Sequence, residues 1–387
     1  MGKKKLLIFT NLFPSRWAPN KAAFNYQQFS RLAEEYDVKM VVPVPFMEYI
    51  KNFRYIKEGS FGKFQIKYLC FFYIPGIFRC LHGFFLFLSV LFILGWVRKG
   101  RFEAIFGSWV YPDGFVSVLL AKIFRIPVFI KVHGSDINVF AQERFRRYQI
   151  VYALKNCSFV LSVSEDLKKK MIALGVPENN INVIYNGVDK KIFKPMPVNQ
   201  CRKSLGLDQN FKLILFVGSI IESKGIRELL EAFLLLDTTH KNLGMIVIGE
   251  GSGRTMLERK YSDRLNDSCV RFTGRLGLEE ISMYMSASDI LCLPSYNEGV
   301  PNVLLESMAC GLPVVATSVG GIPEIVTDDG GVLVEPENTD DLVRGLELAL
   351  QKKWDKTKIV KSAMKYSWEK NINDIDKEIR KYTLDRS

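Results

Sequence analysis

Residues 291–326 constrain the fold of this chain more than any other stretch, and they read LCLPSYNEGVPNVLLESMACGLPVVATSVGGIPEIV. Apolar runs at 290–293 and 313–316 predict two strands, and Pro301 and Gly311 bracket a short helix between them. A helix start leaves its first backbone N–H groups without partners, and the helix dipole adds partial positive charge there. The stretch therefore predicts a strand–loop–helix–strand unit whose helix start suits a phosphate.

Two carboxylates frame this helix start. Glu298 lies in the loop before the helix, and Glu306 lies within the helix. A carboxylate accepts hydrogen bonds from paired sugar hydroxyls, as an acidic residue does with ribose in dinucleotide-binding folds. Taken alone, two such glutamates are more typical of solvated surface charges. Beside a phosphate site, they favour binding of a ribose by Glu306 and of a second sugar by Glu298.

A longer pattern surrounds the two carboxylates. It consists of Glu298, Gly299, Pro301, Asn302, Glu306, Met308, Ala309, Gly311, Pro313, Val314, Val315, Ala316, Gly320, Gly321 and Glu324. This pattern resembles the donor-site signature of the retaining family-4 glycosyltransferases of the GT-B superfamily, which include bacterial surface-polysaccharide transferases of the teichuronic acid and exopolysaccharide type. The resemblance implies that Glu298 contacts the transferred sugar and Glu306 the nucleotide ribose. It also implies that the diphosphate meets the backbone of Gly299, Val300, Pro301, Asn302 and Val303.

Length and composition indicate two domains in a reducing compartment. The chain has 387 residues, which is longer than a domain with a single hydrophobic core usually is, and 48% of its residues are hydrophobic. Its seven cysteines are scattered without a C-x-x-C pair, which argues against a disulfide framework and a zinc site. The resemblance implies an α/β fold of the GT-B type, in which two Rossmann-like domains turn their parallel sheets toward a shared active-site cleft. We place the acceptor domain at 1–195 and the donor domain at 196–367, with a terminal helix at about 368–387 that crosses back to the first domain.

Strands and helices alternate in the N-terminal half. Apolar runs at 4–10, 38–42 and 128–132 predict parallel strands, whose ligands lie at their carboxyl ends. The third run ends in His133-Gly134-Ser135-Asp136. This ending resembles the His-Gly-x-Asp element of the same family, whose His lies near the reacting sugar, and the alternative is a structural histidine that holds a loop. Asp136 is expected to cap the turn that follows it.

A second series of strands carries the remaining donor contacts. The strand at 213–217 leads to Ser219 and Lys224, where related enzymes usually place an Arg and a Lys against the donor diphosphate. Lys224 matches and Ser219 does not, and a solvated surface lysine is the alternative for Lys224. Glycines after the strand at 245–248 permit close backbone approach to a nucleotide, and the strand at 270–274 resembles the one whose end meets the base. The candidate donor contacts from these strand ends are Ser219, Gly249, Gly251, Arg254, Arg275 and Leu276.

The most apolar segment of the chain is at 71–101. Its uninterrupted part, 83–97, is shorter than the roughly 20 residues that a spanning helix needs, and a basic cluster follows at 98–101. Two interpretations remain, a core helix of the first domain or a helix that dips into one leaflet of a membrane. Lys and Arg outnumber Asp and Glu by more than two to one in residues 1–195, whereas acidic residues are in slight excess in the rest. The first domain therefore suits an anionic partner, with a solvated basic surface as the alternative.

These observations predict a glycosyltransferase that moves a hexose-type sugar from a UDP- or GDP-sugar to a lipid-linked saccharide acceptor in cell-surface polysaccharide biosynthesis. Its predicted catalytic residues are Glu298, His133 and Lys224. Lys224 and the helix amides would stabilise the departing diphosphate, while Glu298 and His133 would orient the sugar. The resemblance implies retention of anomeric configuration and a reaction that requires no cofactor and no metal.

The expected partners are the nucleotide-sugar donor, the saccharide acceptor and an anionic membrane surface, and we expect no nucleic acid. The expected location is the cytoplasm, at the inner face of the cell membrane. Two other classes of function stay open. One is a nucleotide-sugar epimerase of the same fold, which needs no acceptor. The other is a non-catalytic protein that binds nucleotide-sugars or, with a steep salt dependence, nucleic acid.

Overall fold

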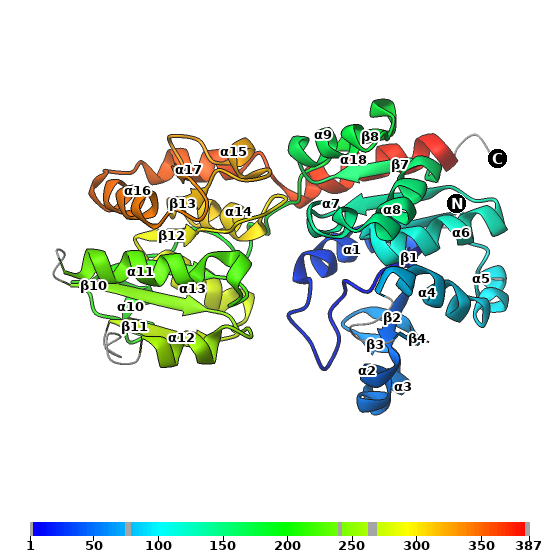
Figure 1. The fold of residues 1–387 in the computed structure, drawn as a ribbon, viewed down its shortest axis with the longest axis horizontal. Helices are drawn as coiled ribbons and strands as arrows, with labels where there is room; N and C mark the ends of the chain where they lie inside the picture. Colours follow the sequence, from blue (N-terminus) through cyan, green and yellow to red (C-terminus); the bar gives the residue numbers. More distant parts are fainter. Residues whose placement is uncertain (1–2, 74–78, 239–241, 262–268, 384–387) are drawn as a thin grey trace. The chain divides into compact units, whose positions relative to one another are not determined.

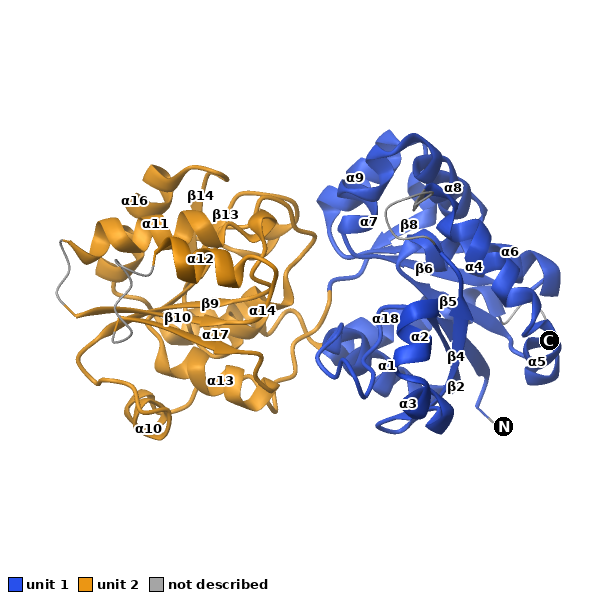
Figure 2. Cartoon of the chain, turned by 60° about the horizontal axis from the view of Figure 1, so that its bottom comes forward, with its two compact units in different colours: residues 1–185, 368–387 blue, residues 186–367 orange. Residues whose placement is uncertain are grey.

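The chain forms two compact units, and the computed structural model describes residues 3–73, 79–238, 242–261 and 269–383 (Figures 1 and 2). Unit 1 comprises Met1–Tyr185 and Trp368–Ser387, and unit 2 comprises Asn186–Ser367. The terminal helix thus belongs to the same unit as the N-terminal residues. The boundary falls at Tyr185, whereas the sequence placed it after residue 195, so Pro195 and Pro197 lie inside unit 2.

Unit 1 is built on an eight-stranded sheet with the order β3-β4-β2-β1-β5-β6-β7-β8. All neighbouring strands are parallel except β3 and β4. The strands are continuous apolar runs because both faces of a parallel sheet are covered by helices. The strands are β1 (Lys5–Phe9), β2 (Asp37–Pro45), β3 (Ser60–Phe61), β4 (Phe64–Phe71), β5 (Ala104–Ser108), β6 (Val128–Val132), β7 (Phe159–Ser162) and β8 (Ile181–Val183).

Helices cover both faces of this sheet. One core contains buried side chains of α4, α5, α6, α8 and α9, and the other contains those of α1, α3 and the terminal helix α18. Ile372, Ile375 and Ile379 of α18 are buried in the second core, which explains why this helix belongs to unit 1. The helices are α1 (Ala23–Glu35), α2 (Phe46–Lys51), α3 (Phe53–Glu58), α4 (His82–Leu91), α5 (Leu94–Gly100), α6 (Phe115–Phe124), α7 (Ser135–Asn138), α8 (Arg144–Asn156), α9 (Glu165–Ala173) and α18 (Trp368–Thr383).

Unit 2 is built on a six-stranded parallel sheet with the order β11-β10-β9-β12-β13-β14. Helices α11 and α16 pack together, and α10, α13, α14 and α17 form a second group (Figure 2). The strands are β9 (Lys212–Val217), β10 (Leu243–Ile248), β11 (Val270–Gly274), β12 (Ile290–Leu293), β13 (Val314–Thr317) and β14 (Gly331–Val334). The helices are α10 (Val198–Ser204), α11 (Ile226–Asp237), α12 (Arg254–Lys260), α13 (Leu278–Ala287), α14 (Asn302–Ala309), α15 (Ile322–Ile325), α16 (Thr339–Gln351) and α17 (Lys356–Ala363). The predicted strand–loop–helix–strand unit is β12–α14–β13.

The apolar segment at 71–101 forms two short helices, α4 and α5, and its residues 74–78 lie outside the described residues. Among the described residues, no single helix is long and apolar enough to cross a membrane, and α4 with α5 meets that criterion only as a pair bent by 67°. Leu86, Val90 and Val97 of this pair are buried in the core of unit 1, while Phe84 and Phe92 are exposed. The buried side chains suit a core helix of the first domain, and the exposed ones suit a helix that contacts a membrane.

Candidate active site

Lys224 and Glu298 meet at the carboxyl ends of the central strands of unit 2. The order of the sheet reverses at β9, because β10 lies on one side of it and β12 on the other, and ligands of open α/β sheets bind at such a switch point. Lys224 follows β9 and Glu298 follows β12, and their side chains form an ion pair. The side chains are 25% and 11% exposed, respectively, so the pair is open to solvent on one side.

Close packing of neighbouring loops holds this pair in place. Tyr296 donates its backbone N–H to the Ser223 carbonyl (2.9 Å) and its hydroxyl to the buried Glu228 carboxylate (2.8 Å). Gly249 has φ 144°, and a Cβ there would lie 1.8 Å from the Gly218 carbonyl oxygen. A Cβ on Gly251 would lie 2.1 Å from the Ile220 carbonyl oxygen. These two glycines are therefore required by the packing of the loop after β10 against the loop after β9.

The start of helix α14 leaves donors free. Within the described residues, the backbone N–H groups of Val300, Asn302 and Val303 donate to no acceptor. Pro301 has no N–H, and the side-chain oxygen of Asn302 accepts from Asn186 (2.9 Å). The unpaired amides expected at this helix start are thus present next to Glu298, where they can bind an anion.

Glu306 lies in the same helix, one turn beyond these amides. Its carboxylate is half-buried and makes no hydrogen bond or ion pair with other described residues. Burial raises the pKa of the Glu306 carboxyl to about 7. A half-buried carboxylate without a donor among the described residues is suited to accept hydrogen bonds from ligand hydroxyls.

The other predicted donor contacts differ in how available they are. Ser219 and Arg275 are exposed, and Leu276 is half-buried. Arg254 pairs with Glu250 (2.6 Å) and with Glu258 (2.8 Å). Since two carboxylates share its guanidinium, Arg254 carries little net positive charge toward a diphosphate.

His133 lies at the carboxyl end of β6 in unit 1. Its Nε2 is 2.9 Å from the Ser108 hydroxyl at the end of β5, and its ring centroid is 5.2 Å from that of Phe24. Burial, assisted by the charge of Lys131, lowers the pKa of His133 well below 6.5. The imidazole is therefore neutral at physiological pH, and it can donate or accept hydrogen bonds but is a weak base.

Asp136 holds the His133 loop, although not as expected. We predicted that it would cap the turn after it, but its carboxylate accepts from the backbone N–H groups of Gly134 (2.8 Å), His133 (3.2 Å) and Val110 (3.3 Å). The turn formed by Gly134 places these earlier N–H groups toward the side chain. Asp136 is thus a structural partner of the His133 loop.

Sequence reasoning missed a buried carboxyl at the switch point of unit 1, between β1 and β5. Asp113 is fully buried, and its Oδ2 accepts from the Asn11 backbone N–H (2.6 Å). Among the described residues, its Oδ1 and the side-chain oxygen of Asn11 have no hydrogen-bond partner. Burial raises the pKa of Asp113 to about 8. The signal in the sequence was an acidic residue in a Pro-Asp-Gly turn soon after a predicted strand.

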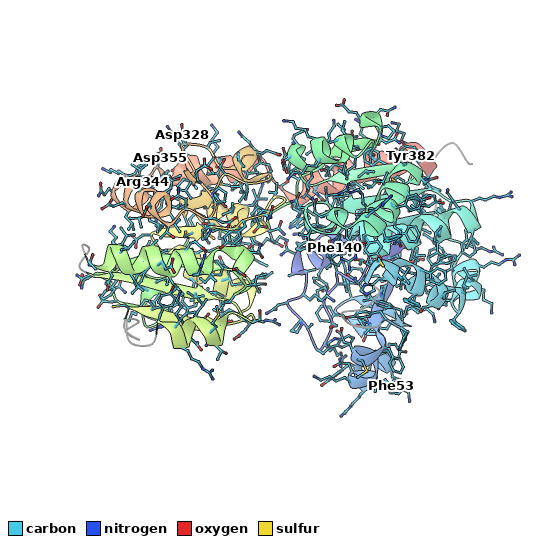
Figure 3. The ribbon with its side chains drawn as sticks, viewed as in Figure 1. Phe53, Phe140, Asp328, Arg344, Asp355 and Tyr382 are labelled. Atoms are coloured by element: carbon cyan, nitrogen blue, oxygen red, sulfur yellow. The ribbon has the colours of Figure 1, made fainter. Side chains whose placement is uncertain are left out.

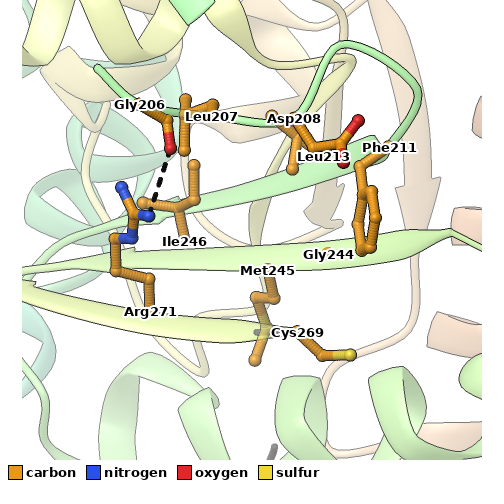
Figure 4. A pocket seen from close by; sticks show the side chains of 10 residues that line it. All are labelled: Gly206, Leu207, Asp208, Phe211, Leu213, Gly244, Met245, Ile246, Cys269 and Arg271. Atoms are coloured by element: carbon orange, nitrogen blue, oxygen red, sulfur yellow. Dashed lines mark hydrogen bonds between the residues drawn. The ribbon is translucent and has the colours of Figure 1, made fainter. Parts of the chain in front are cut away.

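A cavity of about 280 Å³ in unit 2 does not belong to this site (Figure 4). It lies at the amino ends of β9, β10 and β11, the edge of the sheet opposite to Lys224 and Glu298. Leu213 and Met245 line it, and Arg271 donates to the carbonyls of Leu205 (3.1 Å) and Gly206 (3.4 Å). Arg271 is therefore engaged in closing a loop.

Known protein families match both units. Residues 60–191 match the model of Glycosyltransferase Family 4, and residues 198–366 match the model of Glycosyl transferases group 1. An uncharacterised glycosyltransferase of Methanocaldococcus jannaschii is 32% identical over 289 residues, which cover 73% of this chain and 76% of that protein. A putative teichuronic acid biosynthesis glycosyltransferase of Bacillus subtilis, TuaC, is 25% identical over 359 residues, 88% of each chain.

Solved structures match the whole chain. HepE of Anabaena, in complex with UDP, has a TM-score of 0.75 at 18% identity over 98% of this chain and all of that one. Sucrose-phosphate synthase of Thermosynechococcus elongatus has a TM-score of 0.76 at 18% identity over 98% of this chain and 99% of that one. These structures share the fold, which is the expected pair of Rossmann-like domains. The chain therefore belongs to the family-4 glycosyltransferases and has the GT-B fold.

Proposed function

We propose that this glycosyltransferase moves a sugar from a UDP- or GDP-sugar onto a lipid-linked saccharide during assembly of a cell-surface polysaccharide, with retention of anomeric configuration. Polysaccharide assembly is supported by the relative named for teichuronic acid biosynthesis, and a nucleotide-sugar donor by the HepE complexes with UDP and with UDP-glucose. The observation that carries the proposal is the Lys224–Glu298 pair at the switch point of unit 2, next to unpaired amides of α14.

The chemistry of this cluster suits a leaving diphosphate. When the bond between the anomeric carbon and the phosphate oxygen breaks, the nucleoside diphosphate takes the electron pair and the sugar ring becomes positive. Lys224 and the amides of Val300, Asn302 and Val303 stabilise the developing anion, because fixed donors need no reorganisation. Glu298 then accepts from hydroxyls of the transferred sugar and holds its anomeric carbon toward the acceptor.

In this proposal, Glu306 binds the ribose of the donor. Its carboxylate has no donor among the described side chains, so hydroxyls of a ribose would supply the missing hydrogen bonds. The acceptor hydroxyl forms the new bond to the anomeric carbon, and its proton passes to the departing phosphate oxygen. No cofactor and no metal takes part.

His133 positions the sugar in unit 1. Its lowered pKa disfavours a role as general base, whereas a neutral imidazole held by Ser108 is a good hydrogen-bond partner for a hydroxyl. We expect His133→Ala to lower turnover. Undiminished turnover in that variant would remove His133 from the mechanism.

The lipid-linked acceptor and the location at the inner face of the cell membrane rest on surface properties of unit 1. Lys and Arg predominate in this half of the chain, and α4 exposes Phe84 (51%) with Phe92 (91%) just after its end. An exposed apolar surface with basic surroundings is typical of a protein that contacts an anionic bilayer.

The decisive experiment is a screen of nucleotide-sugars for thermal stabilisation of the purified protein, followed by a transfer assay with the donor that binds. A donor that binds only the folded state raises the unfolding temperature by mass action. Glu298→Gln and Glu306→Gln should reduce the shift, and Asp340→Asn, an exposed carboxylate on α16, should not. If no nucleotide-sugar shifts the transition, or if both variants keep full transfer rates, the proposal is wrong. A product formed without an acceptor would identify an epimerase.

A further inference from the structure

Unit 1 contains a recess at the amino ends of its strands, the edge opposite to His133. It has a volume of about 810 Å³, and residues from the starts of β1, β2 and β4 line it together with the end of α3 and part of α5. Its defining side chains are Lys5, Lys39, Lys67, Lys99 and Trp96, and we call it the lysine recess. Nothing in the proposed transfer reaction uses these residues.

The charges in the lysine recess are not balanced. Its two carboxylates are engaged, because Asp37 pairs with Lys39 (3.7 Å) and Glu58 pairs with Arg16, which is not part of the lining. Lys5, Lys67 and Lys99 form no ion pair with any of the described residues. Like charges gathered in one hollow repel each other, and a bound anion relieves that repulsion.

Trp96 gives the recess a polarizable wall. The Lys67 ammonium lies 5.4 Å from the centroid of the Trp96 ring, which itself packs against Phe102. This cation–π contact orients the Lys67 side chain and does not neutralise its charge. A Trp and several Lys side chains are the combination found where proteins meet the headgroup layer of a bilayer.

Exposed apolar side chains lie on the helices that line the recess or precede them along the chain. On α2 and α3, Met47 is 72% exposed and Ile50 and Phe53 are each 57% exposed; Phe53 is labelled in Figure 3. On the side of α4 and α5, Phe84 is 51% exposed and Phe92 is 91% exposed. The end of α3 and part of α5 line the recess, whereas α2 and α4 precede these helices along the chain and do not line it. Phe92 lies just before α5, which carries Trp96 and Lys99 of the recess, so basic and apolar side chains on this part of the chain match an anionic interface in both charge and polarity.

We propose that the lysine recess binds phosphate headgroups of an anionic lipid bilayer, while the exposed apolar side chain of Phe92, between α4 and α5, enters the interface. This inference rests on the membrane contact in the proposed function and names the elements and the lipid chemistry that make it. Because the recess lies at the amino ends of the strands, headgroups bound there leave the His133 edge of the same sheet open.

The test is sedimentation of the full chain with vesicles at low salt, with vesicles of phosphatidylcholine alone compared with vesicles that also contain phosphatidylglycerol. The variants are Lys67→Gln/Lys99→Gln, and as a matched control Lys155→Gln/Lys169→Gln, which removes the same charge from α8 and α9 of unit 1. One lysine near an anionic surface contributes roughly fivefold to the partition coefficient, so the recess variant should lose about thirtyfold. The partition coefficient of the control variant should fall by less than a third of that factor. Phe92→Ser removes apolar surface and no charge, so it should weaken binding both at low salt and in a parallel measurement at high salt.

Several results would overturn the proposal. One is the absence of binding to phosphatidylglycerol vesicles, and another is an equal loss of vesicle binding in the recess and control variants. A third is thermal stabilisation by inorganic phosphate without any vesicle binding, which would mean that the recess binds a soluble anion. Transfer to a short soluble acceptor is measured in parallel. Normal transfer by a recess variant that no longer sediments supports the docking role, whereas a wild-type protein that sediments but transfers no sugar contradicts only the proposed function.

Discussion

The two sheets place charged side chains at the same topological position but treat them in opposite ways. At the switch point of unit 2, Lys224 and Glu298 neutralise each other and remain partly open to solvent. At the switch point of unit 1, Asp113 is fully buried and one of its oxygens has no partner in the described part of the chain, and Lys131 on the neighbouring strand β6 is 1% exposed. The first arrangement can exchange its partner for a ligand, and the second cannot do so without moving its surroundings.

This difference separates groups that act on a ligand from groups that hold a loop. Water screens an ion pair that is open to solvent on one side, so a diphosphate can take Lys224 from Glu298 at a modest cost in free energy. Burial without full hydrogen bonding raises the free energy of an ionised carboxylate. Burial therefore raises the pKa of Asp113 to about 8. The Asp113 bond to the Asn11 N–H fixes the start of the loop between β1 and α1.

Loss of Lys224 should have the largest effect. Lys224→Ala removes the cation that we propose stabilises the departing diphosphate, and we expect kcat to fall about 10²–10³-fold, as when one preorganised donor is lost. Because the ion pair with Glu298 is open to solvent on one side, its loss should lower the unfolding temperature only slightly. Lys353→Ala, at an exposed position after α16, is the matched control. A loss of activity that parallels a loss of folding would show that Lys224 has a structural role instead.

Glu306→Gln should have the next largest effect, and it should fall on donor binding. A hydrogen bond to a charged acceptor is worth about 1.5–3 kcal/mol, so the Kd for the nucleotide-sugar should rise roughly ten- to hundredfold. Since the pKa of Glu306 is about 7, the wild-type affinity should decline as the pH falls below 7, when the carboxylate is protonated and ceases to accept two hydrogen bonds. Titration calorimetry at pH 6 and pH 8 measures this. An equal pH dependence in the variant would contradict the assignment.

The strands were predictable from the sequence because buried parallel strands are continuous apolar runs. The runs at 4–10, 128–132 and 213–217 correspond to β1, β6 and β9. The helices α2 and α3 were not predicted, since they expose Met47 and Phe53 and therefore lack a regular apolar face. The break between α4 and α5 was also missed, because an apolar run does not reveal where a helix bends.

The site of unit 2 was more predictable than that of unit 1. Lys224 and Glu298 each follow a predicted strand, and parallel strands bring their carboxyl ends to one edge, so their meeting follows from topology. Asp113 reads as an ordinary turn residue in the sequence. Its burial and its unpartnered oxygen depend on how the loop after β1 packs, which no local pattern encodes.

Asp113→Asn should change how stability depends on pH. The pKa of Asp113 is raised from 3.8 to about 8, so between these values the folded protein binds a proton that the unfolded chain does not. Stability from this group is therefore full below about pH 4 and is lost as the pH rises to 8, by at most about 1.4 kcal/mol per pH unit. Denaturant unfolding from pH 5 to 9, plotted as wild type minus variant, removes the contributions of Asp136 and Lys131. A flat difference curve would mean that Asp113 is ionised throughout.

The smallest effect should be the coupling between Lys224 and Glu298 in the protein without donor. A double-mutant cycle with Lys224→Met and Glu298→Gln, measured by urea unfolding, should give a coupling free energy below about 1 kcal/mol, because water screens a pair that is partly exposed. A coupling of several kcal/mol would place this pair in the same class as the buried groups of unit 1 and would make its release to a diphosphate too costly. If the coupling free energy is small without donor and either variant strongly lowers the transfer rate, the effect on transfer cannot come from the ion pair itself. Both side chains must then act on the ligand.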